Sequence, residues 1–152
     1  IALSFNMKVI FFDPFKSYKS KKIKKINDLN KFLKAVDILS LHLHLNKNTH
    51  HLIGESELSL LKKDSIIINT SRGSIIDNRA LLKFLEQSKI KGAALDVLED
   101  EEAIINKKDN PLIKYSMSNN NLIITPHIGG ATYESVRKSD QYVLQKFLNK
   151  NK

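Results

Sequence analysis

The chain has 152 residues, 41% of them hydrophobic, and this length and composition predict one domain with a substantial core. It contains no cysteine, which excludes disulfides, thiolate zinc sites and a cysteine nucleophile; this agrees with a reducing cytosol, so we expect a cytoplasmic protein. No stretch reaches the roughly 18 consecutive apolar residues that a membrane span needs, so we expect no membrane partner.

The formal net charge of +9 comes mostly from lysine, because only Arg72, Arg79 and Arg137 among the 25 basic residues are arginines. The most basic run, residues 16–25, carries a single tyrosine and no aromatic–glycine pattern on which bases could stack. We interpret this run as a solvated lysine face and expect no nucleic-acid partner. A basic nucleic-acid binder remains the third hypothesis.

Apolar runs of strand length alternate with helical patterns. The first residues read as the tail of a helix through Asn6 that leads straight into a strand, so we interpret the chain as a fragment. The strand candidates are residues 7–12, 36–41, 65–69, 92–97 and 121–125, and their mostly continuous apolar character is typical of strands covered on both faces. The helical candidates are residues 28–36, opened by Asp28, 55–63, 78–88, with Asp77 as N-cap, and 131–149.

Residues 116–121, rich in asparagine, predict a loop, with Pro111 and Pro126 on either side of it. The order of strands and helices predicts an α/β fold with a Rossmann-like doubly wound parallel sheet. In such sheets ligands bind beyond the carboxyl ends of the strands, and the chemically interesting residues all follow predicted strands. They are Asp13, the turn of Ser71, Arg72 and Gly73, Asp96, and His127 with Gly129 and Gly130.

Asp13 has the position and charge to accept hydrogen bonds from both hydroxyls of an adenosine ribose, which favours NAD over NADP. The other interpretation is an aspartate that opens a turn before Pro14. The lysines from Lys16 onward could neutralise a 2′-phosphate, which weakens the preference for NAD.

Arg72 suits a carboxylate partner, because a guanidinium offers two parallel donors and a lysine does not. The alternative is an arginine that satisfies nearby carbonyls. Gly73 lets the backbone approach a flat ligand closely. His127, between a proline and two glycines, is a candidate general acid/base, although a lone loop histidine is more often structural. The acidic run of Glu99, Asp100, Glu101 and Glu102 could supply its carboxylate partner; as an isolated feature that run is a solvated loop.

Four further histidines, His42, His44, His50 and His51, suggest metal binding, but no third ligand stands out in the sequence, so we expect no metal site. A hydrolase triad of Ser71, His127 and Asp96 is also conceivable. It lacks the G-x-S-x-G elbow and gives Arg72 no role.

Four motifs in order resemble the D-isomer-specific 2-hydroxyacid dehydrogenases, in particular their D-3-phosphoglycerate dehydrogenase-like members: "VIFFDPF", "DILSLHLHL…NTHHLIG", "INTSRGSIIDNRALLKFL…KGAALDVLEDE" and "NLIITPHIGGATYES". The match spans nearly the whole chain. The resemblance implies an NAD-dependent oxidoreductase that moves a hydride between the nicotinamide and C2 of a small D-2-hydroxy acid, 3-phosphoglycerate being one candidate.

The resemblance also assigns roles. Arg72 would bind the substrate carboxylate, His127 would exchange the hydroxyl proton, and Glu101 would orient that imidazole. Asp13 would take the adenosine ribose and Asp96 the nicotinamide carboxamide. The remaining cofactor-binding positions would be Pro14, His42, Thr49, Asn69, Thr70, Gly129 and Gly130.

The sequence departs from the family pattern in two places. The stretch after His42 has His44 and Lys47 where the family usually carries prolines, so this loop should be looser. No G-x-G-x-x-G occurs, so the Rossmann-like sheet should be partial, lacking the first strand and its Gly-rich loop. Residues 1–152 would then be the C-terminal portion of a dinucleotide-binding domain, with the substrate domain mostly or wholly absent. Such a fragment should bind NAD poorly and be inactive alone.

Because members of the family commonly form dimers, the resemblance implies a homodimer for the full-length parent. The competing hypothesis from another class is a non-catalytic NAD-sensing protein, similar to the corepressors built on the same fold, because fold alone does not determine function.

Overall fold

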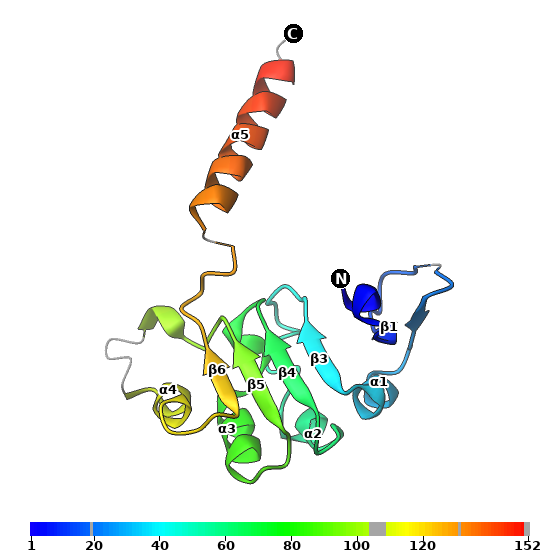
Figure 1. Ribbon diagram of the computed structural model, residues 1–152, viewed down its shortest axis with the longest axis vertical. Helices are drawn as coiled ribbons and strands as arrows, with labels where there is room; N and C mark the ends of the chain where they lie inside the picture. Colours follow the sequence, from blue (N-terminus) through cyan, green and yellow to red (C-terminus); the bar gives the residue numbers. More distant parts are fainter. Residues whose placement is uncertain (19, 104–108, 131, 151–152) are drawn as a thin grey trace.

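The computed structural model describes residues 1–18, 20–103, 109–130 and 132–150. Its centre is a four-stranded parallel sheet in the order β3-β4-β5-β6 (Figure 1). These strands are β3 (Ile38–Leu41), β4 (Ile66–Asn69), β5 (Gly92–Leu95) and β6 (Leu122–Ile124). Leu41 pairs with Asn69, Asn69 with Leu95, and Leu95 with Ile124, so the four carboxyl ends lie in one row. The predicted parallel α/β fold is confirmed.

A second, two-stranded parallel sheet joins β1 (Val9–Phe11) to β2 (Ile23–Lys25), beyond β3 (Figure 1). The sequence did not predict β2, because it lies at the end of the lysine-rich run that was interpreted as a solvated face. The expected helical start is a short 3₁₀ helix, η1 (Ala2–Phe5), which ends at Asn6 with a left-handed φ of 57°.

Among the described residues, four short helices connect the strands: α1 (Leu29–Ala35), α2 (Glu55–Leu58), α3 (Asn78–Glu86) and α4 (Pro111–Ser116). The carboxylates of Asp28 and Asp77 accept backbone N–H groups at the starts of α1 and α3, which confirms both N-caps. Helix α4 was missed: Pro111, interpreted as punctuation, occupies the first turn, and the side chain of Asn110 caps it. Helix α2 is shorter than the predicted 55–63.

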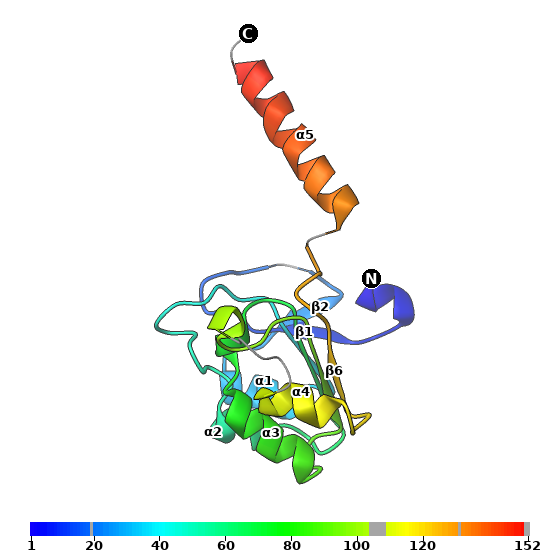
Figure 2. The same cartoon turned by 90° about the vertical axis from the view of Figure 1, so that its left-hand side faces the viewer.

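All four helices lie on one face of the four-stranded sheet (Figure 2). Successive strands from β3 to β6 step in one direction, and right-handed crossovers that step in one direction fall on the same face. Burial therefore alternates: Leu39 and Ile67 are buried against the helices, whereas Ile38 and Ile123 on the other face are 40% and 61% exposed. The expectation of strands covered on both faces was wrong for the described residues.

The last helix, α5 (Tyr133–Lys150), follows β6 and projects away from the sheet (Figures 1 and 2). It agrees with the predicted helix over 131–149, whose first residue, Ala131, lies outside the described residues. Its apolar side chains, among them Tyr142, Val143 and Phe147, are exposed. Within the described ranges, no helix combines the length and apolar character needed to cross a bilayer.

Candidate functional site

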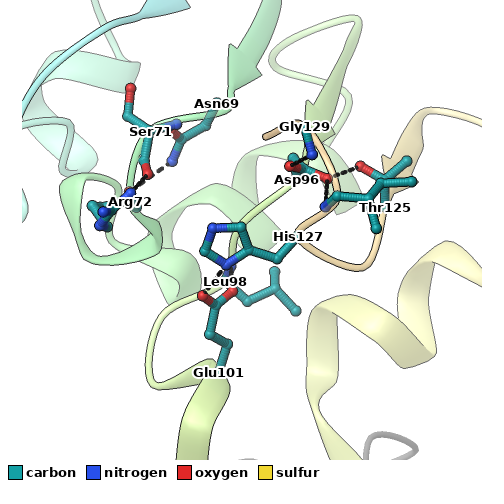
Figure 3. A network of polar contacts seen from close by, with 10 residues as sticks. Asn69, Ser71, Arg72, Asp96, Leu98, Glu101, Thr125, His127 and Gly129 are labelled. Atoms are coloured by element: carbon teal, nitrogen blue, oxygen red, sulfur yellow. Dashed lines mark hydrogen bonds and ion pairs between the residues drawn. The ribbon is translucent and has the colours of Figure 1, made fainter. Parts of the chain in front are cut away.

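Most of the residues singled out in the sequence lie in loops that leave the carboxyl ends of β4, β5 and β6, and the strand register places these ends side by side. The loop after β4 carries Arg72, the loop after β5 carries Glu101 in a short 3₁₀ helix, η3 (Glu101–Ala103), and the loop after β6 carries His127. Figure 3 shows these three side chains in one region, with the imidazole against Glu101 and the Arg72 turn on the opposite side from Asp96. The predicted gathering at one edge is confirmed for these three loops, whereas Asp13 follows β1 in the separate two-stranded sheet.

The central contact of the site joins His127 to Glu101. The distance between His127 Nδ1 and Glu101 Oε1 is 2.5 Å, and the side chains are 48% and 32% exposed (Figure 3). Glu101 Oε2 also accepts the backbone N–H of Leu98, at 3.2 Å. The carboxylate is thus oriented by its own turn, and it occupies Nδ1 while the other ring nitrogen, Nε2, stays available to a ligand.

Asp96 holds the loop that presents this histidine. Its buried carboxylate accepts hydrogen bonds from Thr125 Oγ1 at 2.5 Å, from Ile128 N at 3.0 Å and from Gly129 N at 2.7 Å (Figure 3). Burial by itself would raise the pKa of Asp96, but these three hydrogen bonds, together with nearby His127, lower it below its usual value. A direct bond to a nicotinamide carboxamide would have to share oxygens that the protein already uses.

His127 has a left-handed φ of 55°, an unusual conformation for a residue with a side chain. The two glycines of this loop, Gly129 and Gly130, do not adopt a positive φ. A Cβ on Gly129 would lie 2.8 Å from Asp96 Oδ2, so this glycine serves the carboxylate contact. A Cβ on Gly130 would meet nothing within 4 Å, which leaves open space beside the loop.

The turn after β4 is built by polar side chains. Asn69 is buried and bonds to both sides of the turn: its amide donates to the Arg72 carbonyl at 2.9 Å and its carbonyl accepts Ser71 N at 3.0 Å. Arg72 itself is exposed, and its Nη1 donates to the Ser71 carbonyl at 2.7 Å. This is the carbonyl contact that the sequence offered as an alternative, and it uses one guanidinium nitrogen.

Gly73 permits a close approach, but not to a ligand as expected. A Cβ at this position would lie 1.9 Å from the Leu98 carbonyl carbon and 2.2 Å from Glu99 N. The backbone beside Arg72 therefore packs directly on the start of the loop that carries Glu101. This contact fixes the distance between two parts of the site that are far apart in sequence.

Ser71 does not belong to a hydrolase triad. Its hydroxyl donates to the Leu41 carbonyl at 2.6 Å and accepts Leu43 N at 3.2 Å, so it links two loops. His127 pairs with Glu101, and Asp96 bonds to Thr125 and the backbone. The Ser71, His127 and Asp96 triad considered from the sequence was wrong.

Asp13 follows β1 and opens a turn, which is one of the two interpretations made from the sequence. Its Oδ1 accepts the backbone N–H groups of Phe15 and Lys16, at 2.8 and 2.9 Å, in a turn that contains the exposed Pro14. These bonds lower the pKa of Asp13, with a smaller contribution from the positive charges of Lys25 and Lys16. The carboxylate is therefore ionised at neutral pH, and both bonds use the same oxygen.

The loop after β3 holds two other predicted cofactor positions. His42 Nε2 lies 2.9 Å from Ser40 Oγ, and Thr49 Oγ1 donates to the His44 carbonyl at 2.6 Å, which closes a turn over 46–51. Thr70 is exposed directly after β4. Sequence reasoning missed Thr125, which makes the shortest hydrogen bond to Asp96, and the pairing of His51 with Glu99. Neither pairing has a local signal, because the partners lie 29 and 48 residues apart.

Among the acidic candidates the structure selects Glu101, while Glu99 contacts His51 and Asp100 is exposed with a φ of 51°. The side chain of Glu102 lies outside the described residues. A guanidinium, an imidazole and a carboxylate that orients the imidazole can bind an anionic substrate and move a proton.

Comparison with known proteins agrees with this chemistry. The sequence model of the D-isomer specific 2-hydroxyacid dehydrogenase NAD binding domain matches residues 1–129. The chain belongs to this family. The resemblance predicted from the four motifs is thereby confirmed.

Individual relatives have related activities. The chain is 48% identical over 103 residues, or 68% of its length, to a glyoxylate reductase from Thermococcus litoralis, and 36% identical over 147 residues, or 95% of its length, to a D-3-phosphoglycerate dehydrogenase from Methanocaldococcus jannaschii. A D-lactate dehydrogenase from Aquifex aeolicus, solved with NAD and lactic acid, superposes with a TM-score of 0.81 at 37% identity over 97% of this chain. The chain spans 29% and 26% of the two curated relatives and 48% of the solved chain.

Proposed function

We propose that this chain supplies the NAD-binding and proton-transfer residues of an NAD-dependent oxidoreductase that acts on C2 of a small D-2-hydroxy acid. The observation that carries the proposal is the His127–Glu101 pair, with Nδ1 to Oε1 at 2.5 Å, opposite the Arg72 turn (Figure 3). Family membership supports the same reaction class. The substrates named for the relatives, glyoxylate, 3-phosphoglycerate and lactate, share a carboxylate next to the reacting carbon and define the candidate class.

The geometry of the site suggests a separate role for each of the three residues. Arg72 leaves its bond to the Ser71 carbonyl and offers a guanidinium fork to the substrate carboxylate. His127 receives the C2 hydroxyl proton at Nε2 on oxidation and returns it on reduction, while Glu101 at Nδ1 holds the ring and stabilises its positive charge. Bound NAD supplies the nicotinamide carbon that accepts or donates the hydride.

The cofactor-side residues fit this role. Asp13 is ionised, and Oδ1 takes both backbone bonds, so Oδ2 is the oxygen we assign to the ribose hydroxyls. The exposed His42 and Thr70 and the open space beside Gly130 belong to the loops after β3, β4 and β6, and the exposed Pro14 follows β1. Asn69, Thr49 and Asp96 act indirectly, because their side chains shape the loops that line the cofactor.

We further propose that residues 1–152 are the C-terminal portion of a dinucleotide-binding domain whose substrate domain lies in other parts of the protein. Two parallel sheets that share no strand, and a sheet face with Ile38 and Ile123 exposed, support this view. The exposed apolar residues of α5 support burial in a larger cytoplasmic homodimer.

The experiment is NADH oxidation by the complete gene product against a panel of 2-oxo acids that includes glyoxylate, pyruvate and 3-phosphohydroxypyruvate. We expect saturable turnover with one member of the panel, and its loss in Arg72→Ala with NADH binding retained. Tight NADH binding with no turnover on any member would contradict the proposal and favour a non-catalytic sensor.

A further inference from the structure

Three potential metal ligands meet beside the site, outside the contact of Glu101 with His127. His51 Nε2 lies 2.5 Å from Glu99 Oε1, and the His50 ring stacks against the His51 ring with centroids 4.0 Å apart. One donor atom from each of the three residues lies within 4.8 Å of the other two. The histidines had no third ligand in the sequence; Glu99, 48 residues after His51, supplies one through the fold.

The donor set has a defined chemical preference. Two imidazole nitrogens and one carboxylate oxygen form a ligand set typical of Zn²⁺ and similar borderline divalent ions. A tetrahedral zinc ion with bonds of about 2.1 Å holds its donors roughly 3.4 Å apart. Because the His50 side chain is exposed, it can rotate toward the other two ligands at little cost.

The backbone of two of the three ligand residues, His51 and Glu99, is already held in place by contacts with other loops. His51 donates its N–H to the Ser74 carbonyl at 2.8 Å and has a left-handed φ of 49°. The start of the Glu99 loop is pressed against Gly73, where a Cβ would lie 2.2 Å from Glu99 N. The entropic cost of ordering these two residues when an ion binds should therefore be small.

We propose that His50, His51 and Glu99 bind a divalent transition-metal ion of the zinc type, with water completing the coordination. The ion would join the turn over 46–51 to the loop that carries Glu101, two residues after Glu99. This inference concerns the described chain itself and does not depend on the proposed dehydrogenase activity.

The test is isothermal titration of the untagged complete gene product with ZnCl₂, together with the visible absorption of added Co²⁺. We expect one ion per chain and the strong absorption of a four-coordinate cobalt site. His50→Gln and Glu99→Gln should each weaken binding about 10-fold or more, because loss of even an outer-shell partner costs that much at known metal sites. His44→Gln, an exposed histidine of the same loop outside the cluster, should bind as the wild type does.

Glu99→Gln retains the size of the side chain and a hydrogen bond to His51, so a thermal unfolding curve without metal should confirm that it folds. The absence of saturable binding by the wild-type chain would overturn the proposal and leave His51 and Glu99 as an ion pair between loops. Equal affinity in the wild type, His50→Gln and Glu99→Gln would overturn it as well.

Discussion

Glu101 lies 26 residues before His127 in the sequence, and their closest atoms, Oε1 and Nδ1, are 2.5 Å apart. Two further contacts bring them together. Asp96 fixes the histidine loop through Thr125 and two backbone N–H groups, and Gly73 packs against the loop of Glu101. The pair is therefore preorganised by the protein, and the predictions below test its supports as well as its chemistry.

Arg72→Lys tests the need for a guanidinium. A lysine keeps the charge but loses the two parallel donors, so KM for the 2-oxo acid should rise about 10- to 100-fold, the equivalent of a charged hydrogen bond. Steady-state kinetics of the complete gene product measure this change. The matched control is Arg79→Lys, an exposed arginine on α3, which should leave KM as it is. Equal KM values in the two variants would exclude a bidentate role for Arg72.

Gly73→Ala should be among the most damaging single-methyl additions, because the new Cβ would lie 1.9 Å from the Leu98 carbonyl carbon. Backbone has to move to relieve this overlap, at a cost of about 3 kcal/mol or more in unfolding free energy. Gly130→Ala places the same methyl group in open space and should change stability by no more than about 0.5 kcal/mol. Urea unfolding of both variants measures these changes. Similar losses of unfolding free energy in the two variants would mean that Gly73 is not closely packed.

Asp96→Asn tests the carboxylate that holds the histidine loop. Its pKa is lowered in the folded state, so the ionised form stabilises the fold above the unfolded-state pKa of about 3.9, and this contribution is lost as pH falls through the folded-state pKa. The variant should lose about 2 kcal/mol at pH 7, because an amide nitrogen cannot accept the Gly129 N–H. The difference from the wild type should shrink as the pH approaches 3.

Unfolding free energies at several pH values give this comparison, with the exposed Asp64→Asn as control. A loss that stays constant from pH 7 to strongly acidic solution would show that the charge of Asp96 contributes nothing.

Asp13→Ser should relax the preference for NAD. Removing the carboxylate takes away the repulsion of a 2′-phosphate, while Lys16 and Lys25 remain nearby to attract one. The ratio of kcat/KM for NADPH over NADH should rise about 10-fold, since a charge contact is worth roughly 1.4 kcal/mol. An unchanged ratio would place the adenosine ribose away from Asp13.

The sheet could be predicted from sequence because its strands are continuous apolar runs, as over residues 65–69, and because Asp77 is a local capping signal. Strand β2 could not, since it has one apolar residue, Ile23, followed by two lysines. Helix α4 was missed because Pro111 was interpreted as the boundary of a loop, although proline is equally suited to the first turn of a helix.

The site divides in the same way. Arg72, Glu101 and His127 were singled out from motifs, and the gathering of their loops followed from the topology of a parallel sheet. The left-handed backbone of His127 and the contact of Gly73 with Leu98 depend on pieces that meet only after folding, so no local pattern could reveal them.

The most direct measurement is a double-mutant cycle on kcat with His127→Ala, Glu101→Gln and the double variant, in the complete gene product. His127→Ala should lower kcat about 10²- to 10⁴-fold, the usual worth of a positioned acid/base. If Glu101 acts through the imidazole, its loss should add little once His127 is gone, so the double variant should resemble His127→Ala. Multiplying effects, or a His127→Ala enzyme as active as the wild type, would contradict the assignment of proton transfer to this pair.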